Sequence, residues 1–329
     1  AALGFKRLED LIGRTDLLYQ ISRGAEELDD LDLNPLLVQA DPGSYSRHST
    51  RKERNAVPDT LDAQIEVDAA PLLDHGEKMQ LTYNVRNTMR SIGARISSHI
   101  VKKWGMNVLA PGHLTLRLRG SCGQSLGAFA VQGLKIEVFG DANDYVGKGL
   151  SGATIALRPM PSVSFAPRDN TIIGNTVLYG ATAGKLFAAG GAGERFAVRN
   201  SGAVAVVEGA GCNACEYMTG GMVAILGPVG DNFAAGMTGG MAFVYDTDGR
   251  FEDKLNPDSI VWQRVEMPYW EEILRALISE HQMETGSEFA GEILSRWDDE
   301  LKRFWQVVPR EMVSRLSHPL AHPERTAAE

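Results

Sequence analysis

The chain has 329 residues, of which 43% are hydrophobic and 23% charged, so it can bury a large core and form more than one domain. A net charge of −9 argues against nucleic acid as the main partner, and no apolar run approaches the roughly 18 residues of a membrane span. Three cysteines, an odd number, fit a reducing cytoplasm better than a disulfide framework, and the N-terminus lacks a signal-peptide layout.

Residues 1–83 are predicted to be a linker or an extension from a preceding domain. Apolar residues such as Leu3, Leu8 and Ile12 predict a helix over 1–20, and the start at Ala1 suggests a fragment of a longer protein or a processed product. The polar run SYSRHSTRKERNAVPD (44–59) is typical of a solvated linker or of a segment that lies on another surface. A patch that binds phosphate or acids is the alternative.

Residues 84–110 are predicted to form a capping helix. Asn84 is a plausible N-cap and Gly105 a plausible stop. One apolar face is expected, because hydrophobic residues recur at intervals of three and four: Val85, Met89, Ile92, Ile96, Ile100 and Trp104. Such a helix would cover the open end of the repeat that follows.

A glycine-led repeat occupies residues 111–246, where a small-residue turn leads again and again into a short apolar run. Its intervals are 19, 28, 22, 19 and 19 residues, too short for a crossover helix of ordinary length. The repeat glycines are Gly133, Gly152, Gly180, Gly202, Gly221 and Gly240. The fold class predicted is mainly β, a right-handed parallel β-helix (solenoid) with flanking α-helices.

Composition agrees with this prediction. Residues 111–245 hold 25 of the 35 glycines but only 17 charged residues. Strands as uniformly apolar as AVAVV suit a position covered on both sides, so Val204, Val206, Ile225 and Phe243 are expected to be interior or covered. Residues 247–329 are predicted to be a helical region with a disordered tail; one helix begins at Pro268, and another follows Ser287 and includes Phe304.

Candidate chemistry is sparse. Cys212-Asn-Ala-Cys215 lacks the second ligand pair of a zinc site, and Cys122 is predicted to lie four repeats away, about 19 Å, too far for one iron–sulfur cluster. Small buried or turn cysteines are the favoured interpretation, with a redox or metal role as the alternative. The run GGAG (190–193) resembles a phosphate loop but lacks a following helix, so it is read as a turn.

Other catalytic patterns are weak as well. The seven histidines are scattered, at positions 48, 75, 99, 113, 281, 318 and 322. Polysaccharide lyases and hydrolases on β-helices use clustered acids, whereas the acids of the repeat are spread out: Glu137, Asp141, Asp144, Glu194, Glu208, Glu216 and Asp231. No catalytic, cofactor-binding or metal-binding residue is therefore predicted in this chain.

Four long runs, at 83–105, 120–157, 174–209 and 215–227, resemble the C-terminal domain of the glutamate synthase large subunit. The resemblance covers nearly the whole chain and implies an oxidoreductase of glutamate biosynthesis and ammonia assimilation, in the cytoplasm. It implies partner domains in the same subunit: a glutaminase, a central domain and a barrel with FMN and a [3Fe–4S] cluster. It also implies an electron donor, either a small subunit with flavin and iron–sulfur groups or ferredoxin.

In that family glutamine supplies ammonia internally to convert 2-oxoglutarate and a reductant into glutamate. The resemblance implies that this chain is a structural, inter-domain scaffold without an active site of its own. The β-helix subunit of formylmethanofuran dehydrogenases shares the glycine repeat and is the second choice, and a free-standing scaffold is the third. The role of Cys212 and Cys215 stays open.

Overall fold

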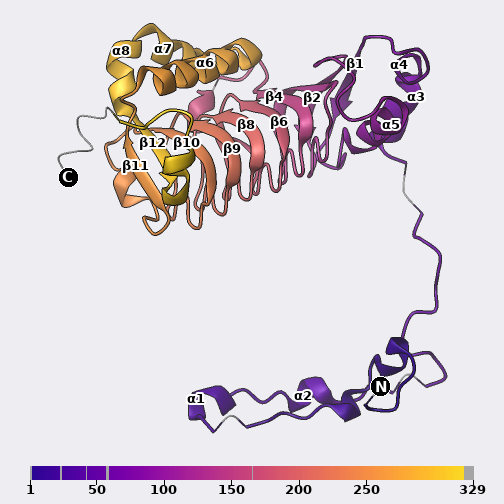
Figure 1. Cartoon of the computed structure of the whole chain (residues 1–329). Helices are drawn as coiled ribbons and strands as arrows, with labels where there is room; N and C mark the ends of the chain where they lie inside the picture. Colours follow the sequence, from indigo (N-terminus) through magenta and orange to yellow (C-terminus); the bar gives the residue numbers. More distant parts are fainter. Residues whose placement is uncertain (1, 23, 42, 57–58, 165, 322–329) are drawn as a thin grey trace. The chain divides into compact units, whose positions relative to one another are not determined.

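The computed structural model describes residues 2–22, 24–41, 43–56, 59–164 and 166–321 (Figure 1). It divides into two compact units, Ala1–Pro58 and Asp59–Glu329. No helix among the described residues is long and apolar enough to cross a membrane. The larger unit is a mixed α/β structure with a mostly parallel sheet and flanking helices, so the expected parallel pairing and flanking helices are confirmed.

The smaller unit contains only short elements. The expected helix over 1–20 is replaced by two 3₁₀ turns, which contain no buried residue. Gly13 has a φ of +74° and separates them, and large apolar side chains such as Leu8 and Tyr19 are about four-fifths exposed. An amphipathic pattern forms a stable helix only where its apolar face is buried, which this unit does not provide. The elements are η1 Leu8–Leu11, η2 Thr15–Leu17, α1 Glu26–Asp29 and α2 Asn34–Leu37.

Twelve strands of the described residues form the sheet of the larger unit, in the order β1-β2-β3-β4-β6-β8-β9-β10-β12-β11, with β5 and β7 off this path. Pairing is parallel from β1 to β10 and antiparallel for β12 and β11. The strands are β1 Met79–Val85, β2 Leu114–Cys122, β3 Leu134–Ala142, β4 Ser151–Arg158, β5 Thr171–Ile173, β6 Ala183–Ala188, β7 Gly191–Ala192, β8 Ser201–Val207, β9 Thr219–Ile225, β10 Gly239–Tyr245, β11 Ile260–Arg264 and β12 Phe304–Pro309.

A second row of parallel pairing accompanies the first. It joins Ile173 to Ala192, Ala192 to Ala210 and Ala210 to Val229. A corner between the two rows repeats in each unit, with left-handed backbone at every second residue. In successive repeats these corner residues are Ser125–Phe129, Tyr145–Gly149, Thr176–Gly180, Arg195–Arg199, Asn213–Tyr217 and Asn232–Gly236. Figure 1 shows the repeats as closely stacked loops below the labelled strands.

Two hydrophobic clusters lie on the two faces of the main strands. Ala205 and Val207 belong to the cluster inside the repeats, whereas Val206 points the other way, into a cluster shared with α6 (Pro268–Thr285). Ile225 and Phe243 are fully buried in the first and second clusters respectively, while Val204 is partly buried. These strands are therefore covered on both sides, which explains their uniformly apolar sequence.

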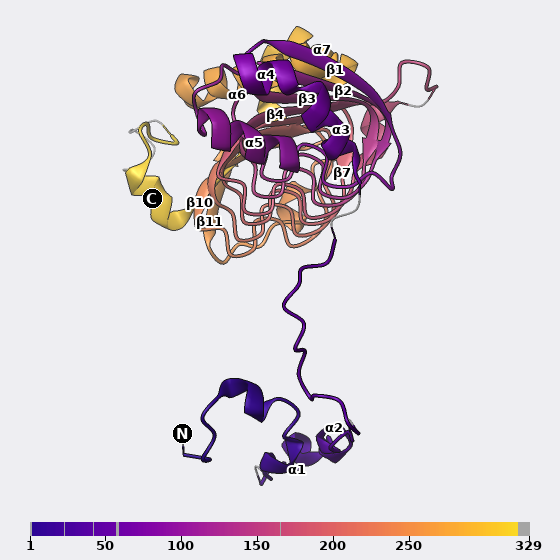
Figure 2. The ribbon, with the colours of Figure 1, turned by 90° about the vertical axis from the view of Figure 1, so that its right-hand side faces the viewer.

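The N-terminal end of the stack is covered by α3 Leu61–Asp68, α4 Ala70–His75 and α5 Ala94–Trp104 (Figure 2). The expected helix over 84–110 is shorter, because Asn84 belongs to β1, where it pairs with Arg119. The cap of α5 comes from a distant residue: Asp62 accepts hydrogen bonds from the backbone N–H groups of Gly93 and Arg95, both at 2.7 Å. Sequence spacing cannot indicate such a cap.

The C-terminal end differs more from expectation. The helix α6 begins at Pro268 as predicted, and Ser287 caps α7 Glu288–Ser295 by accepting from the Ala290 N–H. Phe304, however, belongs to β12, which pairs antiparallel with β10 and closes this end. The remaining elements are α8 Trp297–Glu300, η3 Pro167–Asp169, η4 Phe251–Asp253, η5 Leu301–Arg303 and η6 Arg310–Arg315.

Part of the predicted disordered tail is packed. Leu320 is buried, its carbonyl accepts from Gln263, and the Pro319 carbonyl accepts from the Trp270 indole at 2.9 Å. The rest of that tail, 322–329 with His322, lies outside the described residues.

Candidate functional site

Most of the predicted repeat glycines lie at the start of a strand and pack against the neighbouring repeat. A Cβ at Gly202 would lie 2.0 Å from the Thr182 carbonyl oxygen, closer than any real contact. Gly180 is different: it has a φ of +65° and open space around a Cβ. It lies at a corner of the repeat, and Gly184 instead occupies the strand position, with a Cβ 2.5 Å from the Ala153 carbonyl oxygen. Two features explain the unequal intervals of 28 and 22 residues in the sequence. Gly180 was taken as the repeat glycine of β6 in place of Gly184, and the extra residues 159–170 follow β4.

The cysteines are free thiols. Cys122 ends β2 and is buried, and burial together with the nearby charge of Asp141 raises its pKa to about 12. Cys215 is fully buried at a corner, and burial raises its pKa as well, whereas Cys212 is half-buried. Cys122 and Cys215 are therefore poor nucleophiles and poor ligands, because both roles use the thiolate.

The residues present do not fit an iron–sulfur cluster. No grouping of three or more His, Cys, Asp or Glu side chains within the described ranges could hold a metal ion. Cys122 belongs to the first full repeat, and Cys212 and Cys215 to the fifth, in agreement with the spacing expected from the sequence. A cluster requires thiolate ligands gathered around one point.

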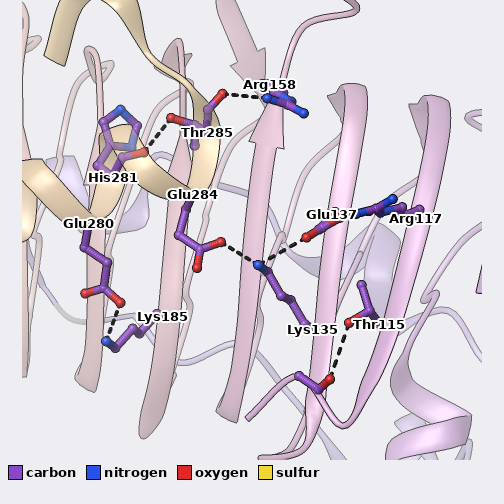
Figure 3. A network of polar contacts seen from close by, with 11 residues as sticks. Thr115, Arg117, Lys135, Glu137, Arg158, Lys185, Glu280, His281, Glu284 and Thr285 are labelled. Atoms are coloured by element: carbon purple, nitrogen blue, oxygen red, sulfur yellow. Dashed lines mark hydrogen bonds and ion pairs between the residues drawn. The ribbon is translucent and has the colours of Figure 1, made fainter. Parts of the chain in front are cut away.

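The charged and titratable side chains that interact most closely lie where α6 crosses the outer face of the sheet. Figure 3 shows Lys135 of β3 between two carboxylates, Glu284 at 2.7 Å and Glu137 at 3.1 Å. Burial acts to lower the pKa of Lys135, but the hydrogen bonds and charges of Glu284 and Glu137 outweigh it and raise the pKa above its ordinary value. Burial would raise the pKa of Glu137, yet Arg117 and Lys135 lower it.

Next to this network lies an open groove with a volume of about 680 Å³. Its borders are residues 159–164 and 166–168 after β4 and the junction of α6 and α7, and Ala189 also lines it. Arg158, the last residue of β4, lines this groove and a smaller one of about 270 Å³ around Lys135. The guanidinium of Arg158 lies 4.4 Å from the ring centre of Phe139, and its Nη1 donates to the Thr285 carbonyl (Figure 3).

A buried polar cluster stands at the inner side of the groove. Glu208 is 2% exposed, its Oε1 accepts a short hydrogen bond from the Ser287 hydroxyl, and His281 Nε2 lies 3.3 Å from the same oxygen. His281 is fully buried, and its Nδ1 has no hydrogen-bond partner among the described residues. The carboxylate bridges Ser287 and His281, so the cluster lacks the order of a catalytic triad.

In the sequence, Glu208 and His281 are only two of many scattered polar residues. They lie 73 positions apart and meet because α6 returns across β8. The one signal in the sequence was local: Glu208 directly follows the apolar strand AVAVV, and a charge at the end of a buried strand needs a partner.

Comparison with known proteins gives a consistent picture. The family model "GXGXG motif" matches residues 62–310. The chain is 64% identical over 329 residues to the glutamate synthase [NADPH] large chain of Azospirillum brasilense, covering 100% of this chain and 22% of that protein. It is 46% identical over 316 residues to ferredoxin-dependent glutamate synthase 2 of Synechocystis, covering 94% and 20%.

A third relative is glutamate synthase [NADH] of Schizosaccharomyces pombe, 42% identical over 327 residues and covering 98% of this chain and 15% of that protein. The chain thus spans about a fifth of the length of the relatives that it matches.

Proposed function

Because the chain belongs to the GXGXG family and corresponds to a C-terminal segment of glutamate synthase large chains, we propose that it is the structural, inter-domain scaffold of such an enzyme. The complete enzyme would convert glutamine, 2-oxoglutarate and a reductant into two molecules of glutamate in the cytoplasm. This segment would hold the glutaminase, central and flavin domains at the spacing that internal ammonia transfer requires.

The scaffold in this proposal is a right-handed parallel β-helix. Support comes from the two rows of parallel pairing and from the strong preference of parallel crossovers for the right-handed form. Each repeat would be one coil, closed by its corner of alternating left-handed residues. The antiparallel β12 and β11 would end the stack, and α3, α4 and α5 would cover its beginning.

The observation that carries the proposal is an unbroken row of backbone hydrogen bonds along the corners. Each corner donates to the next repeat with N···O distances of 2.8–2.9 Å. The donors and acceptors are Ser125 to Asp144, Tyr145 to Asn175, Thr176 to Glu194, Arg195 to Cys212 and Asn213 to Asp231. A rod bonded at both its strands and its corners resists bending, which is the property that a spacer between active sites requires.

Cofactors and electron donors belong to the rest of the enzyme in this proposal. FMN and a [3Fe–4S] cluster would sit in the flavin domain, and no step of the reaction would use a residue of this chain. The relatives are named for NADPH, NADH and ferredoxin, so the donor differs among proteins that share this segment. The scaffold would contact the neighbouring domains through one side of the stack and through 41–60, over roughly 2,000 Å² in total.

The test is a glycine substitution in the complete enzyme. Gly221 has a φ of +83°, and a Cβ there would lie 2.3 Å from the Ala203 carbonyl oxygen, so Gly221→Val should distort two adjoining repeats. We expect free ammonia to leak and the yield of glutamate per glutamine to fall, as measured by coupled assays of both products. The control is Gly180→Asn, where a Cβ meets open space and Asn tolerates the left-handed backbone.

Loss of coupling in Gly221→Val with normal coupling in the control supports the scaffold. Circular dichroism shows whether the repeats of Gly221→Val are distorted. If they are distorted and the enzyme still couples the two activities tightly, the proposal is contradicted.

A further inference from the structure

The groove beside α6 contains a buried carboxylate that lacks a strong cation. Glu208 lines the groove, and its basic neighbour among the described residues is the His281 imidazole, with Nε2 at 3.3 Å from Oε1, whereas neither Lys nor Arg pairs with it. Its Oε1 is used by Ser287 and His281, and no hydrogen bond to Oε2 is found in the described part of the chain. A carboxylate taken out of water is costly unless a positive group compensates it, so the groove offers a position for a cation.

Arg158 carries a positive charge at the other end of the groove, so Glu208 and Arg158 form its two charged poles. Arg158 is half-buried, it donates to the Thr285 carbonyl at 3.4 Å, and no carboxylate of the described residues pairs with it. A guanidinium carries five N–H donors in a planar fork, so most of its donors stay available. Planar carboxylates fit such a fork with two parallel hydrogen bonds.

The strand register sets the separation of the two poles. Leu157, before Arg158, pairs with Ala188, and Ala188 pairs with Val207, before Glu208. The two residues therefore stand two strand spacings apart, about 10 Å between backbones. Ala189 lies between them, and its small side chain leaves the floor of the groove open.

Part of the groove wall is apolar and contains Pro159, Pro161, Met160, Val163 and Phe289. Arg168, Glu288 and Glu292 also line the groove, and Arg168 pairs with Glu292. A volume of about 680 Å³ is within the usual range of small-molecule sites, which are largely apolar and carry a few placed polar groups.

We propose that this groove binds an α-amino acid with an apolar side chain. Its ammonium group would meet Glu208, its carboxylate would meet Arg158, and its side chain would lie against Met160, Val163 and Phe289. The site goes beyond the scaffold role and does not depend on it, because binding by the chain itself is what defines it.

The first experiment is isothermal titration of the 329-residue chain with L-phenylalanine. Two matched ligands remove one pole each: 3-phenylpropionate lacks the ammonium group, and 2-phenylethylamine lacks the carboxylate. We expect saturable binding of L-phenylalanine at one site per chain, and affinity lower by about tenfold or more for each analogue, as expected for a lost charge-assisted hydrogen bond. Absence of saturable binding, or equal affinity for either analogue, overturns the proposal.

The second experiment tests the residues. Glu208→Gln and Arg158→Gln should each weaken L-phenylalanine binding by about tenfold or more. Glu280→Gln is the control, because Glu280 lies on the same helix but pairs with Lys185 outside the groove. It should leave the affinity unchanged.

Thermal unfolding of each variant shows whether it is folded. If Glu208→Gln does not fold, Arg158→Gln decides the question, since Arg158 is only half-buried. Unchanged affinity in a folded Arg158→Gln overturns the proposal, and so does a control that loses binding as much as the two site variants.

Discussion

The inside of the repeat stack and its flank beneath α6 are both well buried, yet they are built in different ways. Inside, small apolar side chains such as Ala205 and Val223 meet their counterparts in the next repeat, and backbone pairing sets the register. On the flank, partners such as Lys135 and Glu284 come from segments 149 residues apart. The stack therefore depends on local repetition, and the flank depends on the return of one helix.

Backbone contact should make the stack much more sensitive than the flank to one added methyl group. Gly202→Ala puts a Cβ 2.0 Å from the Thr182 carbonyl oxygen, and only movement of the backbone relieves it. We expect the free energy of unfolding to fall by about 4 kcal/mol or more, the range reached by severe core changes. Denaturant unfolding of the chain measures it.

Gly180→Ala is the control for this substitution, because it meets open space and suffers only from its left-handed backbone, at a cost of about 1–2 kcal/mol. Equal losses in the two variants would show that steric contact between repeats is not what makes these glycines necessary.

Two buried phenylalanines sharpen the comparison at the level of packing. Phe196 belongs to the interior cluster and Phe187 to the cluster beneath α6, and both are fully buried. Replacement by Ala should cost about 3–5 kcal/mol in each case, with the larger loss at Phe196. The interior is enclosed by paired backbone and cannot collapse, whereas α6 can move toward the smaller residue.

Chemical denaturation of Phe196→Ala and Phe187→Ala gives the two losses directly. A larger loss at Phe187 would show that α6 is held as rigidly as the coils, and the distinction between the two regions would not hold for packing.

The same distinction explains what the sequence could predict. The parallel strands were predictable because Gly133, Gly152, Gly202, Gly221 and Gly240 recur before apolar runs, and that pattern is local. The strand glycine of β6 was misplaced to Gly180, since a corner and a strand start both favour glycine. Strand β12 was missed because Phe304 also fits the helical spacing of the preceding residues, and its pairing with β10 is long-range.

The groove could not be predicted at all. Glu208, His281 and Ser287 meet through tertiary contacts that leave no periodic trace in the sequence. The capping of α5 by Asp62 was hidden for the same reason, because cap and helix lie 31 residues apart. The repeated strands were thus predictable from the sequence. The groove and the cap of α5 were not, because they depend on contacts between residues far apart in the chain.

Electrostatics on the flank provides the smallest expected effect. Lys135→Met leaves Glu284 and Glu137 without their shared cation, and we expect a loss of about 1.5–3 kcal/mol near pH 7, the range for hydrogen bonds to charged groups. The pKa of Glu137 is lowered by the fold, so its contribution is present above the ordinary value of 4.5 and is lost as the pH falls through the lowered pKa. The pKa of Lys135 is raised, so its contribution is present below 10.5 and is lost as the pH rises through the raised pKa.

The difference in stability between the chain and Lys135→Met should therefore form a plateau at neutral pH that declines toward both extremes. Unfolding by urea across the pH range measures this difference. Lys185→Met is the matched control, because Lys185 pairs with Glu280 of the same helix but is 44% exposed, so its removal should cost no more than about 1 kcal/mol. A difference that does not change with pH would mean that Lys135 acts on the flank through packing of its aliphatic chain, and not through its charge.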